Sequence, residues 1–297
     1  MKFVRFQIGE AEKLGILNFN ETQIIEIDKV LDRGFLSMVN LIEEISEEEL
    51  KKLKEAVSNE KYTGYSLSEV KLCSPIKRPI HDILCVGVNY RDHLEETQKS
   101  FDESFAEPAK TVYFSKRACE IIGPEDTVKS RMDLDKNLDY EVELAVIIGK
   151  KGIDIPKEKV EEYIFGYSIF NDISARELQQ SHVQWYRGKS LDTFSSMGPA
   201  ILHKSALPFP VEVDVKSFVN GELRQSSNTK LFLADIPQII SEISAGITLE
   251  PGDIIITGTP SGVGMGFKPQ KFMKKGDKVV CEIPEIGKLE NIIGYKI

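Results

Sequence analysis

Acidic side chains at alternate positions distinguish the segment Leu138–Gly149, which reads LDYEVELAVIIG. On a β-strand, Glu141 and Glu143 leave the same face, about 7 Å apart along the chain. A solvated strand edge and a pair of ligands both fit this spacing. Asp172 ends the next apolar strand, IFGYSIFND. Because neighbouring strands lie about 4.8 Å apart, its carboxylate can meet the other two.

Three carboxylates in one pocket need compensation, because mutual repulsion and loss of hydration both disfavour their charged forms. A hard divalent cation resolves this conflict. Three oxygen ligands without histidine or cysteine suit Mg²⁺, Mn²⁺ or Ca²⁺ rather than zinc. Octahedral Mg²⁺ would keep about three coordination positions for water or substrate, which is room for a chelating 2-oxo acid.

A histidine and a glutamate lie three residues apart in NYRDHLEE, at His93 and Glu96. If this segment is helical, both side chains share one face. A carboxylate that orients an imidazole makes a general base for a water molecule, and a surface ion pair is the alternative interpretation. The pair lies in the long polar stretch from Arg91 to Lys110, for which we expect a loop or a short helix.

Two motifs resemble nucleotide-binding sequences but depart from them. Lys189 follows a glycine in YRGKSLDTF, but a P-loop needs glycine at the position of Val183, so a nucleotide P-loop is rejected. A cluster of glycines in TGTPSGVGMG has the spacing G-x-G-x-G, and Pro269 follows where a dinucleotide-binding helix would begin. Neither motif therefore predicts a nucleotide site.

Both motifs still offer groups that can act on an anion. A lysine such as Lys189 near a metal can stabilise an enolate or an oxyanion. The backbone amides of Gly258 and Thr259, with the Thr259 hydroxyl, can bind a carboxylate as a nest, and a tight turn is the alternative interpretation.

The elements that must position these residues are mostly strands. Residues 1–72 predict a strand pair followed by one helix over 37–57, and the proline-containing segment 72–82 marks a boundary. Beyond it, strands are predicted at 83–90, 111–115, 140–149 and 164–172, a hairpin at Asn220–Gly221, a helix that begins at Ser174 with a Ser174/Glu177 capping box, and a helix over 236–246. No regular βαβ alternation appears, so the pattern favours a strand-rich α+β fold over a Rossmann fold.

Composition narrows the class of protein. The 297 residues carry 38 Lys and Arg against 47 Asp and Glu, a net charge of −9 that argues against nucleic-acid binding. The cysteines are scattered, without zinc-site or disulfide spacing, at Cys73, Cys85, Cys119 and Cys281. Neither a signal peptide nor a membrane span is predicted, so we expect a cytoplasmic protein with a small α+β domain at 1–72 and a catalytic domain at 73–297.

Six blocks in order resemble the fumarylacetoacetate hydrolase family: NYRDH, DYEVELAVIIG, FNDISARELQ, GKSLDTFSSMGP, NGELRQ and LEPGDIIITGTPSGVG. The resemblance covers roughly residue 80 to the C-terminus. It implies a mixed, strongly twisted β-roll with peripheral helices, usually a homodimer. Members of this family use a divalent metal to act on 2-oxo acids and 1,3-dicarbonyl compounds.

The resemblance also implies roles for single residues. Glu141, Glu143 and Asp172 match the metal ligands, His93 and Glu96 match the water-activating dyad on a lid, and Lys189 matches the lysine that stabilises enolate charge. The positions that match substrate contacts are Arg176, Gln179, Gly258, Thr259 and Lys116, although Lys116 is followed by Arg117 where the family usually has proline.

The chain is similar to the short microbial branch of this family. The longer animal enzymes have an aromatic residue at the position of Val183, so hydrolysis of fumarylacetoacetate itself is not expected. The resemblance implies cleavage of a C–C bond through a metal-stabilised enolate, with acylpyruvate-type hydrolysis as the first expectation. Oxaloacetate decarboxylation and isomerisation or decarboxylation of 2-oxo-diene diacids are the alternatives within the family. A non-enzymatic 2-oxo acid binding protein is the alternative of another class.

Overall fold

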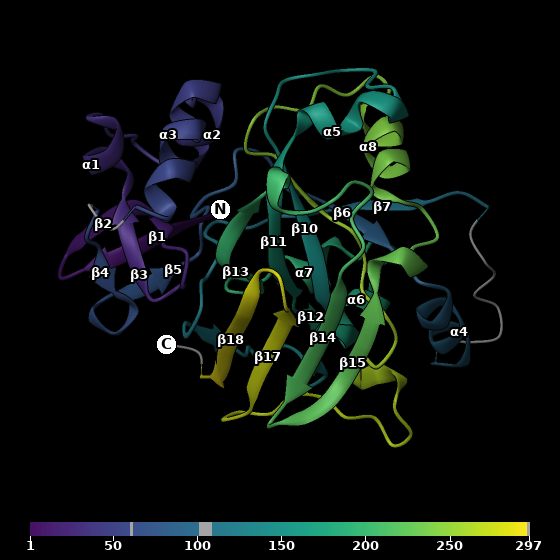
Figure 1. The fold of residues 1–297 in the computed structure, drawn as a ribbon. Coiled ribbons are helices and arrows are strands. Elements are labelled where there is room, and N and C mark those ends of the chain that lie inside the picture. The colour runs from purple at the N-terminus through teal and green to yellow at the C-terminus, as the bar shows by residue number, and fades with distance from the viewer. Residues whose placement is uncertain (60–61, 101–108, 296–297) are drawn as a thin grey trace.

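The computed structural model describes residues 1–59, 62–100 and 109–295, without the side chains of 99 and 100. A large mixed sheet crosses the molecule (Figure 1) in the order β4-β3-β2-β1-β13-β11-β10-β16-β6-β7, with β5 paired to β1. Its strands are β1 (Lys2–Ile8), β2 (Ala11–Leu17), β3 (Gln23–Glu26), β4 (Tyr65–Ser66), β5 (Lys71–Cys73), β6 (Ile83–Gly87), β7 (Val112–Lys116), β10 (Val142–Ile148), β11 (Ile164–Asp172), β13 (Ser195–His203) and β16 (Ile254–Ile256).

The two central strands, β10 and β11, are buried along their whole length. Their apolar runs fit this position because both faces of the sheet are covered. One face packs against α5 (Val160–Tyr163) and α8 (Ile236–Ser244), and the other against α2 (Met38–Glu44) and α3 (Glu47–Val57). Burial of each large aliphatic side chain contributes about 1.5–3 kcal/mol, so these layers hold the strands that carry the acidic residues.

One strand pair near the β7 edge of the large sheet is parallel. β16 pairs parallel with β6, through Ile255↔Leu84 and Ile256↔Cys85, and antiparallel with β10 on its other side. Parallel strands end at the same edge of a sheet. The chain therefore leaves β6 toward Asn89 and leaves β16 toward Gly258 side by side, next to the acidic end of β10.

A second sheet packs against the first in the order β15-β14-β17-β18-β8, and a small sheet pairs β12 with β9. The predicted hairpin at Asn220–Gly221 is confirmed: both residues have positive φ, 52° and 82°, as a tight two-residue turn requires. The strands are β8 (Thr127–Lys129), β9 (Leu138–Asp139), β12 (Ser174–Ala175), β14 (Asp214–Val219), β15 (Glu222–Asn228), β17 (Lys278–Ile283) and β18 (Gly287–Gly294).

The N-terminal part, purple in Figure 1, continues the large sheet rather than forming a separate one. β1 pairs antiparallel with β13 through Lys2↔Leu202 and Phe3↔Ile201, and β5 extends across the predicted boundary at residue 72. Phe3 and Leu41 share a hydrophobic cluster with Ile147 of β10. The division into domains at 1–72 and 73–297 stays a prediction. Side chains from both parts contribute to one hydrophobic cluster.

Three expected helix boundaries differ in the structure. The single helix predicted over 37–57 is two helices, because Ser46 begins a new one with a Ser46/Glu49 capping box. The helix predicted from Ser174 begins at Arg176 and has no side-chain cap, because the Ser174 hydroxyl donates to the Asp172 carbonyl instead. The helix over 236–246 ends at Ser244.

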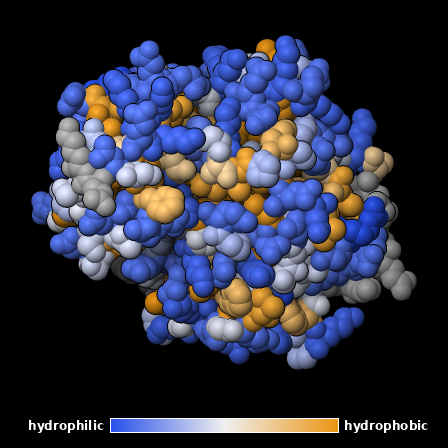
Figure 2. Space-filling view, in the orientation of Figure 1, coloured by the Kyte–Doolittle hydropathy of each residue, from blue (hydrophilic) through white to orange (hydrophobic). Residues whose placement is uncertain are grey.

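The remaining helices lie around the acidic end of β10 and at the periphery. They are α1 (Ile27–Leu31), α4 (Arg91–Ser100), α6 (Arg176–Ser181) and α7 (Tyr186–Lys189), with 3-10 turns η1 (Leu67–Glu69), η2 (Lys157–Lys159), η3 (Lys204–Ala206), η4 (Thr229–Leu231) and η5 (Gly264–Gly266). None of the described helices is long and apolar enough to cross a membrane. The face in Figure 2 is largely hydrophilic, with apolar side chains in separate groups. The expected strand-rich α+β fold is confirmed.

Candidate active site

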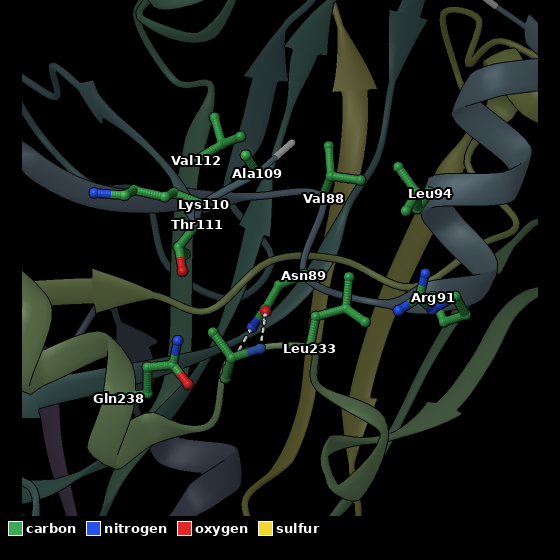
Figure 3. Close-up of a pocket in the computed structure, with 12 residues that line it drawn as sticks. Val88, Asn89, Arg91, Leu94, Ala109, Lys110, Thr111, Val112, Leu233 and Gln238 are labelled. Atoms are coloured by element: carbon green, nitrogen blue, oxygen red, sulfur yellow. Dashed lines mark hydrogen bonds between the residues drawn. The ribbon is translucent and has the colours of Figure 1, made fainter. Parts of the chain in front are cut away.

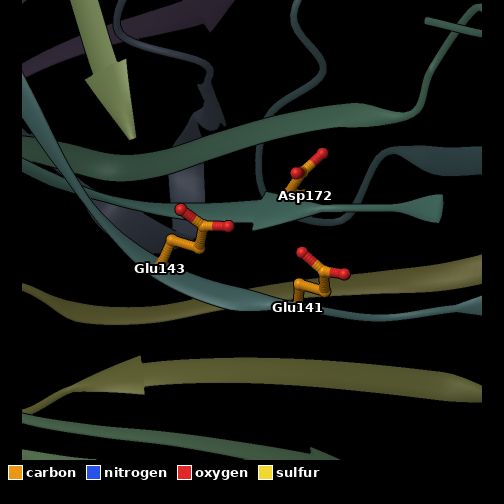
Figure 4. Close-up of side chains that lie close together, drawn as sticks. All are labelled: Glu141, Glu143 and Asp172. Carbon is orange, nitrogen blue, oxygen red and sulfur yellow. The ribbon is translucent and has the colours of Figure 1, made fainter. Parts of the chain in front are cut away.

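Three acidic side chains from two neighbouring strands meet in the interior. Glu141 and Glu143 lie at the start of β10, Asp172 ends β11, and one carboxylate oxygen of each lies within 4.8 Å of the others (Figure 4). The strand register produces this meeting, since Val142 pairs with Asn171 and the Asp172 amide donates to the Glu141 carbonyl. The three carboxylates come together as the strand spacing predicted.

Buried cations compensate two of these carboxylates. The Lys189 ammonium group donates to Glu141 Oε2 at 2.8 Å and to Asp172 Oδ2 at 2.7 Å. Lys116 donates to Asp172 Oδ1 at 2.5 Å. The Glu143 carboxylate accepts a hydrogen bond from the Gly258 amide at 2.5 Å, and no ion pair to it occurs among the described residues. Glu143 is therefore the carboxylate without a cation.

The pKa shifts reflect this unequal compensation. Burial and the Asp172 and Glu141 carboxylates raise the pKa of Glu143 well above its usual range. Burial also opposes ionisation of Glu141, but Lys189 and Arg176 outweigh it and lower the Glu141 pKa to about 2. Burial opposes the charge of Lys189, yet the Asp172 and Glu141 carboxylates raise its pKa, so this ammonium group stays protonated.

The donor set fits a hard divalent cation. With Asp139, which pairs with Arg176, four buried acids face three buried cations, so the cluster is short of positive charge. Oxygen ligands that converge from two rigid strands are the donors that Mg²⁺ and Mn²⁺ prefer. Glu141, Glu143 and Asp172 would hold the ion, as the sequence predicts.

The predicted dyad lies on α4, which docks against the loop that follows β16. His93 Nδ1 lies 3.0 Å from Glu96 Oε2, and the Glu96 Oε1 atom accepts from the Gly262 amide at 2.9 Å. The Ser261 hydroxyl donates to Asp92 at 2.6 Å. With Nδ1 donating to Glu96, His93 Nε2 carries the lone pair that can take a proton.

A glycine in η5 makes this docking possible. A Cβ atom at Gly266 would overlap with the carboxylate of Glu96, so a larger residue there would displace the acid of the dyad from its present position. The glycine-rich loop therefore serves α4 rather than a nucleotide.

A cavity of about 40 Å³ lies between α4 and the carboxylates. His93, Glu141, Glu143 and Lys189 line its polar side. Its apolar wall consists of Val86, Val88, Phe114, Trp185 and Met265. Ligand pockets usually measure about 300–1,000 Å³, so in this conformation the cavity is a narrow one that suits a small ligand.

Arg176 lines this cavity and has one buried donor atom that finds no acceptor among the described residues. Its Nε donates to Asp139 Oδ2 at 2.9 Å, and its Nη1 donates to Gln179 Oε1 at 3.0 Å and lies 2.6 Å from Glu141 Oε1. Its Nη2 is buried without a hydrogen-bond partner, although Arg176 lines the cavity. A buried guanidinium nitrogen without an acceptor is suited to bind a carboxylate of a ligand.

Asp139 is a functional residue that the sequence analysis missed. It is fully buried and accepts hydrogen bonds from the Gly264 amide at 2.6 Å, the Met265 amide at 3.0 Å and Arg176 Nε. It thus joins Arg176 to the loop against which α4 docks. The alternation that singled out Glu141 and Glu143 includes Asp139 two residues earlier, which is the signal that was available.

Two expected substrate contacts are placed differently. Lys116 does not line the cavity, because its ammonium group donates to Asp172 and to the carbonyls of Ile173 and Phe194, which uses all three protons. Its role is to hold Asp172. The Gly258 amide binds Glu143, so this amide is not free for a substrate carboxylate.

The other expected contacts lie at the cavity. Gln179 and Thr259 both line it. The Thr259 hydroxyl is occupied within the fold, because it donates to the Val142 carbonyl and accepts from Gln225. A substrate role for Thr259 stays a prediction.

Comparisons with known proteins identify the family of this chain. Residues 82–293 match the family model described as "Fumarylacetoacetate (FAA) hydrolase C-terminal". The chain is 50% identical over 230 residues to the oxaloacetate tautomerase YisK of Bacillus subtilis (strain 168), covering 77% of this chain and 75% of that protein.

Two solved structures are similar over the whole chain. A fumarylacetoacetate hydrolase (EaFAH) from Exiguobacterium antarcticum has a TM-score of 0.84 and 38% identity, and covers 100% of both chains. A maleylpyruvate hydrolase from Sphingobium sp. SYK-6, in complex with manganese(II) and pyruvate, has a TM-score of 0.78 and 29% identity, again over 100% of both chains. The chain belongs to the fumarylacetoacetate hydrolase family of enzymes.

Proposed function

We propose that this protein interconverts the keto and enol forms of oxaloacetate, or of a similarly small 2-oxo dicarboxylic acid, with a divalent metal. The observation that carries the proposal is a single cavity lined by Arg176, by the Glu141 and Glu143 carboxylates and by one histidine base, His93. Together these groups match a substrate with a 2-oxo acid end and an acidic proton on the next carbon. The similarity to an oxaloacetate tautomerase supports the same substrate.

The chain supplies the proton transfer and the binding contacts. Arg176 Nη2 would bind a substrate carboxylate, and His93 Nε2 would remove a proton from C3. The C–H electron pair then forms the C2=C3 double bond, and the negative charge moves to the oxygen on C2. His93 returns its proton to that oxygen to give the enol, while the Lys189 ammonium group stabilises the charge in between.

Three other features support this chemistry. Glu96 holds His93 in the tautomer with a free Nε2, because it accepts from Nδ1. The small cavity lies beneath α4 among buried side chains, and low local polarity strengthens the charge interactions inside it. A Mg²⁺ or Mn²⁺ ion bound by Glu141, Glu143 and Asp172 supplies Lewis-acid polarisation of the 2-oxo group.

Acylpyruvate hydrolysis, the first expectation from sequence, is the second candidate. The observation that favours it is the His93–Glu96 pair, since an imidazole oriented by a carboxylate can also activate water for attack on a distal carbonyl. The similarity to a maleylpyruvate hydrolase supports this alternative. The small cavity favours the tautomerase, because a hydrolase must also hold the acyl group and a water molecule.

Turnover of oxaloacetate distinguishes these functions. We expect purified protein with Mg²⁺ or Mn²⁺ to accelerate loss of the enol absorbance of oxaloacetate without forming pyruvate, and EDTA to abolish the effect. The His93→Gln variant should lose at least about a hundredfold in rate. His81→Gln is the matched control, because His81 pairs with Asp253 away from the cavity.

Each other outcome assigns another function. Pyruvate formed from oxaloacetate would indicate a decarboxylase, and cleavage of acetylpyruvate without tautomerisation would indicate a hydrolase. Binding of these acids without turnover of either would indicate a 2-oxo acid binding protein. Any of these results contradicts the tautomerase proposal.

A further inference from the structure

Val88 has a backbone conformation that valine rarely adopts. Its φ is +52°, in the left-handed region, immediately after β6 in the sequence GVNY. A β-branched residue there is a genuine outlier, because its Cβ lies too close to the backbone carbonyl oxygen. Glycine would adopt this conformation without strain. A valine at this position therefore needs an explanation other than the backbone conformation.

The position of Val88 supplies this reason, because it lines two neighbouring cavities. One is the catalytic cavity of about 40 Å³, and the other is a cavity of about 250 Å³ (Figure 3). Gly87 also lines both. In Figure 3 the side chain of Val88 lies between those of Leu94 and Ala109. Residues 87 and 88 thus form a partition between the two spaces.

Aromatic packing closes the partition from the catalytic side. A Cβ atom at Gly87 would lie 2.5 Å from the Trp185 ring and 3.2 Å from Val112. Trp185 lines the catalytic cavity, and Val112 lines the larger one. The Trp185 ring also packs edge-on against Phe114, with 5.1 Å between the ring centroids. Little space is left at Gly87, so Val88 is the part of the wall that a smaller side chain would open.

The larger cavity has a positive character. Arg91 and Lys110 line it from opposite sides in Figure 3, and its described lining contains no acidic residue. Lys110 offers an ammonium group to a negatively charged group that reached this space. The chemical class that fits is the distal carboxylate of a longer 2-oxo dicarboxylic acid.

We propose that Val88 determines specificity: its side chain closes the catalytic cavity toward the larger one and so limits the substrate to short 2-oxo acids. This inference rests on the proposed function, since it concerns the length of the same substrate. Arg176, two of the carboxylates and Val88 line the same cavity, so a substrate held there would meet Val88 as part of the wall. Removal of the isopropyl group joins the cavities and admits longer diacids.

Calorimetric binding to the Mn²⁺-loaded protein tests this without any need for turnover. The ligands are oxalate, which is short, and 2-oxoadipate, which is long. In Val88→Ala, the affinity for 2-oxoadipate relative to that for oxalate should rise at least about tenfold, the effect of a few methylene groups in an apolar wall. Val88→Leu is the matched control, because it keeps the wall and should leave that ratio unchanged or lower it.

Charge and strain give two further measurements. 2-Oxohexanoate has the length of 2-oxoadipate without the distal carboxylate, so its affinity should rise less in Val88→Ala than that of the diacid. Val88→Gly should unfold at a higher temperature than Val88→Ala, because both open the wall but only glycine relieves the left-handed conformation. A lower melting temperature for Val88→Gly than for Val88→Ala would show that the backbone at residue 88 is not strained.

An unchanged affinity ratio in both Val88→Ala and Val88→Gly would overturn the proposal, as would an equal rise in Val88→Leu. These results are separate from the fate of the proposed function. Wild-type protein that fails to turn over oxaloacetate contradicts the tautomerase, whereas the affinity ratio still reports whether Val88 limits ligand length.

Discussion

Ion pairs occur in two contrasting settings in this molecule. At the acidic end of β10, the side chains of Lys116 and Asp172 pair with no exposed surface at all. Between the N-terminal strands and the catalytic part, Lys77 and Glu12 pair with exposed fractions of 44% and 43%. Both pairs have good geometry, but their surroundings differ, and so does the reason for their presence.

The difference separates function from stability. An exposed pair contributes about 0–1 kcal/mol and loses little if one partner is removed. A buried pair gives little net stability, because desolvation of both ions offsets their attraction, yet removal of one partner leaves a costly unpaired charge. The buried cluster therefore adds little net stability, as expected for the catalytic site that we propose, while the N-terminal seam, where β1 pairs with β13, depends on its apolar contacts.

The largest expected effect, on catalytic rate, comes from substituting Glu143, the carboxylate of the cluster that has no cationic partner. Glu143→Gln should lower metal-dependent turnover by roughly a thousandfold, because loss of a ligand removes several kcal/mol of charge stabilisation. In EDTA the variant should be at least as stable as wild type in urea unfolding, since it removes a repulsion with Asp172 and Glu141. A variant that is both inactive and unfolded would contradict the contrast between function and stability.

The next effect concerns the residue that joins the cluster to the loop of α4. Asp139→Asn should raise KM more than it lowers kcat, because Arg176 loses the carboxylate that orients it. A change of about 10–100-fold in kcat/KM is expected for loss of a partner that orients a ligand-binding group. Steady-state kinetics check it. Asp253→Asn is the matched control, because Asp253 is also buried but its carboxylate pairs with His81, away from Arg176 and the cavity lining. Equal effects of both variants would indicate a structural role alone.

A smaller effect, on the free energy of unfolding, is expected where β1 pairs with β13. His203 of β13 packs against Phe3 and Phe165, and its Nδ1 accepts from the Ser205 amide. Burial, with Lys204 and the N-terminal amino group, lowers the His203 pKa to about 4. The unfolded chain binds the proton more readily, so stability is complete above about pH 6.5 and is lost as the pH falls toward 4.

Between pH 7 and pH 4.5 this loss amounts to at most about 2 kcal/mol. His203→Asn keeps an acceptor for the Ser205 amide but cannot titrate, so the free energy of unfolding should fall less over this range. Chemical denaturation at the two pH values measures the difference. An identical loss in the variant would show that His203 is not the group responsible.

The smallest effect is expected at the exposed pair. Lys77→Ala should change the free energy of unfolding by less than about 0.5 kcal/mol, because Lys77 and Glu12 are both well solvated. Urea unfolding at low and high salt checks this value. A loss as large as that expected for a buried pair would remove the distinction between the two settings.

Strand pattern predicted most of the fold and the centre of the site. Period-2 alternation placed Glu141 and Glu143 on one face, and strand spacing brought Asp172 to them, because both are local rules of β-structure. The glycine spacing excluded a dinucleotide site for a local reason as well.

What sequence could not predict depends on contacts between distant residues. Ser174 has the spacing of a capping box, but its hydroxyl bonds the Asp172 carbonyl, since β12 pairs with β9 before α6 begins. Lys116 matched a substrate position, yet the strand order directs it behind Asp172. The partition at Val88 depends on a single φ angle, which no composition or spacing reveals.

The parallel pairing of β16 with β6 also decides when the site can assemble. In the large sheet, β16 lies between β10, next to the carboxylates, and β6, which leads to α4. Its three residues, Ile254–Ile256, are made long after both neighbours and must close loops of more than a hundred residues. Such non-local pairing forms slowly. A nascent chain that ends before β16 therefore already contains the cluster and the His93–Glu96 dyad. It lacks the strand that holds β6, which leads to the dyad, next to β10 and its carboxylates.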